Sequence, residues 1–90
     1  KPDTEKFPAL GLAYKAMEIG GNIPCALNAA NEAAVAAYLK DKIPFYGISD
    51  VVGECIERTP FIKEPSVEEI FKTNEETYSL AQRMIAGIEK

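Results

Sequence analysis

Histidine is absent from this 90-residue chain, which narrows the chemistry that the chain can perform alone. Histidine is the usual general base near neutral pH and the commonest metal ligand in proteins, so few routes to catalysis remain. The sequence also lacks a phosphate-binding loop, a GxGxxG fingerprint, a CxxC pair and a serine–histidine–aspartate set. We therefore expect a domain without catalytic, cofactor-binding or metal-binding residues of its own.

Clustered positive charge is also scarce. The net charge is −4; residues 1–45 sum to zero, while residues 46–90 hold five bases and nine acids and supply the whole excess. Binding to nucleic acid or to anionic lipid needs clustered lysine or arginine. The charge pattern therefore predicts no nucleic-acid partner and no membrane-surface partner.

Long apolar runs and cysteines are few. The most apolar run, residues 24–39, is shorter than the roughly 20 residues that span a bilayer, and residues 1–8 show no signal peptide. The two cysteines, Cys25 and Cys55, lie in apolar surroundings on separate predicted helices. This favours buried free thiols in a reducing compartment over a disulfide. We predict a soluble, cytoplasmic protein.

Apolar residues recur at the spacing of a helix through most of the chain. No run of alternating apolar and polar residues reaches the length of a strand. Gly20-Gly21, Thr59-Pro60 and a capping box from Ser66 to Glu69 mark helix ends. We predict an all-α fold, a small four-helix antiparallel bundle, with helices at about residues 8–19, 23–41, 49–58 and 66–88. Asn22 and Ser49 are the expected N-caps of the second and third helices. The domain would occupy residues 7–90, after a linker remnant at residues 1–6.

Each outer helix has a predicted inward face. The first has Leu10, Tyr14 and Met17, widened by Ala13 and Ile19; the third has Val51, Val52, Cys55 and Ile56. In the last, spacings of four and three residues join Val67, Phe71, Asn74, Tyr78, Ala81, Ile85 and Ile88. We expect this seam to belong to one continuous helix, with Asn74 as its weakest point.

The second predicted helix is the most informative segment. Seven of the sixteen residues from Pro24 to Leu39 are alanine, and the only polar ones are Asn28, Asn31 and Glu32. A helix that is apolar nearly all round is expected at the centre of a bundle, with these three residues on one face. They could form an oxygen site for a hard cation, but a single carboxylate would hold Mg²⁺ or Ca²⁺ weakly. We favour an internal clasp, in which they hydrogen-bond buried backbone groups.

Other candidate sites have simpler explanations. Exposure and helix-end electrostatics account for five acidic residues, namely Glu64, Glu68, Glu69, Glu75 and Glu76. The dispersed aromatic residues are expected to plug the ends of the bundle. An acyl carrier protein would need a serine between aspartate and leucine, whereas Ser49 follows Ile48 and precedes Asp50.

Several short motifs carry a family resemblance. They are Pro2-Asp3, residues 6–8, residues 12–14, Gly20-Gly21, ALNAANE at residues 26–32, residues 42–45, residues 48–50 and Pro60-Phe61. In this order, over nearly the whole chain, the sequence resembles the C-terminal domain of 1-deoxy-D-xylulose 5-phosphate reductoisomerase. Asn28, Asn31 and Glu32 lie in its most specific element and serve as a structural signature.

The resemblance implies a parent enzyme with an N-terminal NADPH-binding domain and a central catalytic domain with a divalent cation (Mg, Mn or Co). Such an enzyme converts 1-deoxy-D-xylulose 5-phosphate to 2-C-methyl-D-erythritol 4-phosphate in non-mevalonate isoprenoid biosynthesis, and would be a homodimer. The family's ligand and catalytic residues have no counterpart here, so the 90 residues alone are predicted to be inactive. The alternative is a stand-alone helical protein-interaction module.

Overall fold

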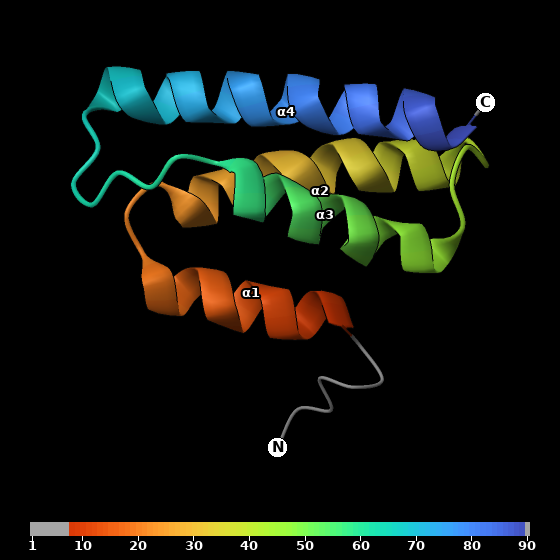
Figure 1. Ribbon diagram of the computed structural model, residues 1–90, viewed down its shortest axis with the longest axis horizontal. Helices are drawn as coiled ribbons and strands as arrows, with labels where there is room; N and C mark the ends of the chain where they lie inside the picture. The colour runs from red at the N-terminus through yellow and green to blue at the C-terminus, as the bar shows by residue number, and fades with distance from the viewer. Residues whose placement is uncertain (1–7, 90) are drawn as a thin grey trace.

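The computed structural model describes residues 8–89, and every regular element among them is an α-helix. The bounds are α1 Pro8–Ile19, α2 Ile23–Leu39, α3 Phe45–Arg58 and α4 Val67–Glu89. Consecutive helices run in opposite directions, and α2 and α3 lie side by side between α4 and α1 (Figure 1). The predicted four-helix bundle is confirmed, while the expected linker at residues 1–6 lies outside the described residues.

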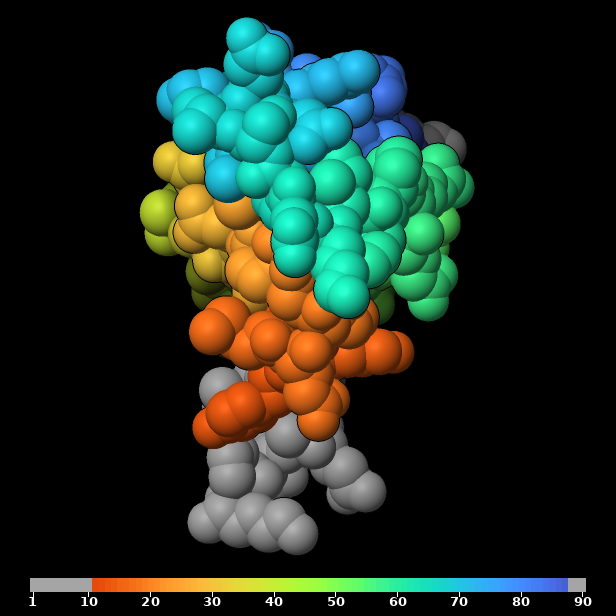
Figure 2. Space-filling view, turned by 90° about the vertical axis from the view of Figure 1, so that its left-hand side faces the viewer, coloured from red at the N-terminus to blue at the C-terminus, as the bar shows by residue number. Residues whose placement is uncertain are grey.

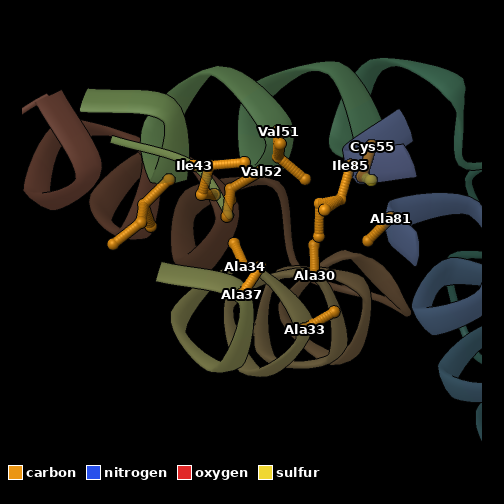
Figure 3. Close-up of a cluster of buried hydrophobic side chains, with 11 residues drawn as sticks. Ala30, Ala33, Ala34, Ala37, Ile43, Val51, Val52, Cys55, Ala81 and Ile85 are labelled. Atoms are coloured by element: carbon orange, nitrogen blue, oxygen red, sulfur yellow. The ribbon is translucent and has the colours of Figure 1, made fainter. Parts of the chain in front are cut away.

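Helices α2 and α3 each pack against the other three, and the contacts of α2 are the more extensive, as expected for the predicted central helix. Its inward face consists of alanines, whose small side chains let the neighbouring helices approach closely. Aliphatic side chains from α3, α4 and the α2–α3 loop complete the buried cluster (Figure 3). Its members are Ala30, Ala33, Ala34, Ala37, Ile43, Ile48, Val51, Val52, Cys55, Ala81 and Ile85. Burial of this apolar surface is the main force that holds the bundle together.

The α1–α2 turn and the start of α4 are built as predicted. Gly20 and Gly21 take φ angles of 75° and 59°, and this left-handed backbone ends α1. At the start of α4, the Ser66 amide donates to the Glu69 carboxylate at 2.9 Å, and the Glu69 amide donates to the Ser66 hydroxyl at 3.1 Å. These reciprocal bonds confirm the capping box.

The α2–α3 connection differs from the prediction at both ends. Helix α2 stops at Leu39 rather than near residue 41, because Asp41 takes a left-handed φ of 60° that a helix cannot continue. Helix α3 begins at Phe45, after an extended Pro44, so the prediction of Ser49 as N-cap is wrong. Pro44 has no N–H and a fixed φ, which suit the beginning of a helix. The Ser49 hydroxyl instead donates to the backbone carbonyl three residues earlier, at 3.1 Å.

Helix α4 is continuous, as predicted, but the inward face of its first half is not the predicted one. The apolar residues expected there, Val67 and Phe71, are exposed, as is Asn74. Thr73 and Thr77 are buried in their place. The second half keeps the predicted face, since Ala81 and Ile85 are buried. The helix thus buries threonines where the apolar spacing pointed to aromatic and aliphatic side chains.

Helix α1 covers the opposite side of the α2–α3 layer with a small part of its surface. Ala16 is buried and Leu12 packs against the core, whereas Tyr14, Met17 and Ile19 are exposed. The predicted inward face of α1 is therefore wrong for these three residues, and the side chain of Leu10 is not among those described. Helix α1 presents these apolar side chains outward because its contacts with the bundle are made on the side that has Leu12 and Ala16.

Candidate functional site

The three polar residues of α2 lie on the outside of the bundle. Asn28, Asn31 and Glu32 are all exposed, and within the described part of the chain they form no hydrogen bond or ion pair. The interpretation of these residues as an internal clasp is therefore wrong. Contacts with α1, α3 and α4 occupy the alanine-rich sides of α2 and leave one side of this central helix uncovered.

This uncovered side forms a shallow groove with a volume of about 420 Å³. Its lining, which we call the α2 stripe, consists of Asn28, Asn31, Glu32, Val35, Ala36 and Leu39. Val35 and Ala36 are half-buried, and Leu39 at the end of the helix is 74% exposed. The α2 stripe thus combines two amides and one carboxylate with an apolar floor and an exposed aliphatic end.

The clasp that the sequence analysis assigned to α2 is made instead by Asn22, in the α1–α2 turn. Its side chain is 1% exposed, and its Nδ2 donates to the Pro60 carbonyl at 2.9 Å and to the Thr73 hydroxyl at 3.1 Å. Its Oδ1 accepts from the Ile62 amide at 2.8 Å, and its own amide donates to the Ile62 carbonyl at 3.0 Å. One side chain thereby joins the turn, the α3–α4 loop and α4, at the end of the bundle seen in Figure 2.

Asn22 occupies the predicted N-cap position of α2, where its carbonyl accepts from the Ala26 amide at 3.2 Å, but its side chain does not cap the helix. Its backbone is helical, with φ −87° and ψ −2°, and its side chain forms no bond to the first turn of α2. The geometry of a side-chain N-cap needs an extended backbone at the capping residue. In the sequence, Asn22 stands out only as an asparagine directly after two glycines. The partners of its side chain lie about forty and fifty residues further along the chain.

Acidic side chains do not converge on a metal site in the described part of the chain, where no group of three or more potential ligands occurs. The five glutamates considered in the sequence analysis are all exposed, as expected for a solvated face. One of them, Glu69, has a structural role in the capping box. A separate ion pair joins Arg58 to Glu54 on one face of α3, at 2.9 Å.

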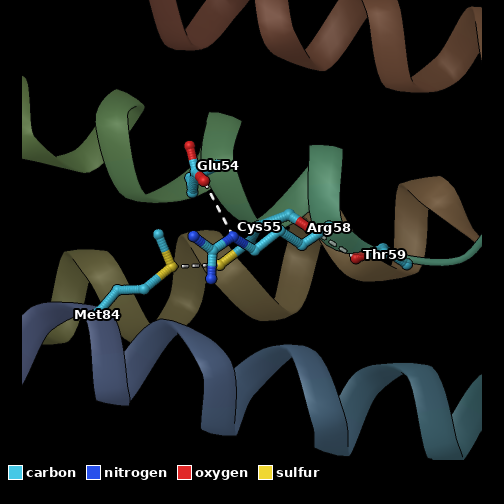
Figure 4. Close-up of polar contacts among 5 residues, drawn as sticks. All are labelled: Glu54, Cys55, Arg58, Thr59 and Met84. Atoms are coloured by element: carbon cyan, nitrogen blue, oxygen red, sulfur yellow. Dashed lines mark hydrogen bonds and ion pairs between the residues drawn. The ribbon is translucent and has the colours of Figure 1, made fainter.

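Both cysteines are free thiols, as predicted, and they differ in exposure: Cys25 is half-buried, whereas Cys55 is fully buried. The Cys55 Sγ donates a weak hydrogen bond to the Met84 sulfur at 3.7 Å (Figure 4). Burial, reinforced by the nearby Glu54 carboxylate, raises the pKa of the Cys55 thiol, although Arg58 opposes the shift. Because the thiolate is the reactive form, Cys55 is suited to packing and not to nucleophilic chemistry.

A larger groove, with a volume of about 600 Å³, lies between the end of α3 and the first half of α4. Arg58 and Arg83 line it together with Glu75 and Glu76. Opposite charges share this lining, so it does not provide the concentrated positive charge that binds a phosphate group.

None of the helices between residues 8 and 89 combines the length and the apolar character that a bilayer-spanning helix requires. Helix α2, which is the most apolar of the four, packs against α1, α3 and α4.

Comparison with known proteins assigns this fold. The structure defines a four-helix domain in which a central alanine-rich helix keeps one polar side uncovered, and the family model for the DXP reductoisomerase C-terminal domain matches residues 1–80. The chain belongs to this family, as the sequence resemblance predicted.

Individual relatives agree with the family model. The chain is 46% identical over 85 residues to the 1-deoxy-D-xylulose 5-phosphate reductoisomerase of Bacteroides thetaiotaomicron and 49% identical over 77 residues to that of Agathobacter rectalis. These matches cover 94% and 86% of the chain but 22% and 20% of the relatives. The chain therefore spans about a fifth of the length of these enzymes.

A solved structure supports the same assignment. The 1-deoxy-D-xylulose 5-phosphate reductoisomerase of Zymomonas mobilis, in complex with NADPH, superposes with a TM-score of 0.84 and is 39% identical in sequence. The match covers 93% of this chain and 22% of that one. At this identity the likeness extends to both the fold and the family.

Proposed function

We propose that the chain is a non-catalytic structural domain of a reductoisomerase, which packs against the catalytic part of the same polypeptide and steadies it. The observation that carries this proposal is the match of nearly the whole chain to about 22% of the relatives. The remaining length of such enzymes leaves room for other domains in the same chain.

The parent enzyme would convert 1-deoxy-D-xylulose 5-phosphate to 2-C-methyl-D-erythritol 4-phosphate with NADPH and a divalent cation, in non-mevalonate isoprenoid biosynthesis. The donor set of residues 8–89 does not fit either group, because it offers neither a cluster of metal ligands nor a glycine-rich loop after a strand. We therefore assign NADPH and the cation to the preceding domains. The parent would be a cytoplasmic homodimer.

Two measurements test this proposal. The isolated 90-residue chain should show helical circular dichroism, without NADPH binding or substrate-dependent NADPH oxidation, whereas the complete protein from the same reading frame should oxidise NADPH. Turnover by the 90 residues alone would contradict the structural role. A reading frame that encodes no further domain would favour an independent interaction module.

A further inference from the structure

The α2 stripe has the geometry of a contact surface. Its six residues lie at positions i, i+3, i+4, i+7, i+8 and i+11, which places them on one side of the helix over about 16 Å. At the C-terminal end of α2, the ring of Tyr38 contacts that of Phe45 edge to face, at 5.6 Å between centroids, and both side chains are exposed. The stripe itself is of mixed polarity and extends from Asn28 in α2 to Leu39 at the end of this helix.

The composition of the stripe is unexplained by the domain itself. Asparagine is a poorer helix former than alanine, because its amide competes for backbone hydrogen bonds. Asn28 and Asn31 nevertheless occupy the interior of a helix that is otherwise rich in alanine, and they form no hydrogen bond in the described residues. Glu32 has no cationic partner there either, and Leu39 leaves most of its surface to solvent. The two asparagines thus lower the helix propensity of α2 without a compensating contact in the described residues.

We propose that the α2 stripe is the docking surface for a preceding domain of the same polypeptide. This inference rests on the proposed function, because it takes its partner from the length of chain that the relatives have beyond this domain. The partner surface would offer hydrogen-bonding groups to Asn28 and Asn31, a lysine or arginine to Glu32, and an apolar recess to Leu39. Such a mixture of polar and apolar contacts is typical of interfaces between domains of one chain.

Two other surfaces fit a docking role less well. The exposed face of α1 has Tyr14 and Met17, but α1 contains no asparagine or glutamine and so offers a partner no side-chain amide. The groove with Arg58 and Arg83 has charges of both signs and no apolar anchor of comparable exposure. Only the α2 stripe, among these three surfaces, combines a groove, unpaired polar groups and an exposed aliphatic side chain.

Cysteine labelling tests the proposal. In a Cys25→Ser background, Asn31→Cys marks the α2 stripe and Glu57→Cys marks an exposed position on α3 as the matched control. The maleimide-labelling rate of each variant is measured by mass spectrometry in the 90-residue chain and in the complete protein. We expect Asn31→Cys to react at least tenfold more slowly in the complete protein than in the 90-residue chain. For Glu57→Cys, the rates in the two proteins should agree within twofold.

Three outcomes would overturn the proposal. Asn31→Cys could react at the same rate in both proteins, or Glu57→Cys could be protected in the complete protein as strongly as Asn31→Cys. The third is that the protection of Asn31→Cys decreases when the complete protein is diluted. The last result would assign the surface to a second copy of the chain. Reductoisomerase activity of the same full-length sample is measured in parallel. If Asn31→Cys is protected but the complete protein has no reductoisomerase activity, the proposed function is wrong and the interface stands. If the complete protein is active but Asn31→Cys is not protected, the function stands and the interface is wrong.

Discussion

The side-chain amide of Asn22 donates a 3.1 Å hydrogen bond to the hydroxyl of Thr73, fifty-one residues further along the chain. Both side chains are buried, so neither polar group can hydrogen-bond to water. The bond between them replaces the hydrogen bonds to water that each group loses on folding. This bond explains why α4 turns a threonine inward, against its apolar periodicity. The polar contact between the α1–α2 turn and α4 thus fixes the rotation of the first half of α4.

Replacement of Asn22 by alanine should destabilise the domain by about 1–3 kcal/mol, because it leaves the part-buried Ile62 amide, the Pro60 carbonyl and the Thr73 hydroxyl without this partner. Urea unfolding followed by circular dichroism measures this change. A loss below about 1 kcal/mol would mean that water replaces the amide at this site.

Asn31→Ala is the matched control for the Asn22 variant. Asn31 is exposed in the interior of α2, where alanine has the higher helix propensity. The variant should therefore leave the stability of the 90-residue chain unchanged or raise it by about 0.5 kcal/mol. If Asn31→Ala instead lost as much stability as Asn22→Ala, Asn31 would have to form internal hydrogen bonds, which the structure does not show.

The two glycines of the α1–α2 turn should respond differently to substitution by alanine. Both have a left-handed backbone, so each variant is expected to lose about 1 kcal/mol through φ alone. At Gly21 the added Cβ would also overlap the Ile62 carbonyl oxygen, whereas at Gly20 it would meet open space. Thermal unfolding should therefore show a clearly larger loss for Gly21→Ala than for Gly20→Ala, and equal losses would argue against this close approach.

The capping box at the start of α4 should have a measurable effect on stability. Ser66→Ala removes the acceptor for the Glu69 amide and should cost about 1 kcal/mol in chemical unfolding. Glu68→Ala, in the same helical turn but outside the box, is the control and should cost less. If the Ser66 and Glu69 substitutions prove additive in a double-mutant cycle, the two side chains do not act as a reciprocal pair.

Cys55 should give the domain a distinctive response to alkaline pH. Its pKa is raised in the folded state, so the unfolded chain loses this proton first as the pH rises past the ordinary thiol value of 9.0. The contribution of Cys55 to stability is therefore constant below that pH and is lost as the pH rises toward the folded-state pKa. In urea unfolding between pH 8 and about 10, the wild-type chain should lose more stability than Cys55→Ala. Parallel pH profiles would contradict the shift.

Much of the fold could be predicted from the sequence, because its signals are local. Paired glycines, a proline after a threonine and a serine three residues before a glutamate act within one helical turn. The central place of α2 follows from its uniform apolar composition. That same uniformity hides which side faces outward, since alanine suits a buried and an exposed side almost equally. The face with Asn28 and Asn31 was therefore assigned to the interior although it lies outside.

The clasp could not be predicted, because its partners are distant in sequence. Nothing near Asn22 identifies Thr73 or the backbone of Ile62 as its partners, and a local N-cap was the simplest interpretation of an asparagine before a helix. The inward threonines of α4 were missed for the same reason. Their polarity argues for exposure unless the buried amide that Thr73 meets is already known.

The position of Asn22 also governs how the domain can move. Its bonds join the α1–α2 turn, the α3–α4 loop and α4 at one end of the bundle, and Gly21 packs against the same loop. Separation of the α1–α2 turn from the α3–α4 loop and α4 therefore requires several hydrogen bonds to break together. A pull on α1 would pass through Gly20 and Gly21 to these bonds, and so to the α3–α4 loop and α4.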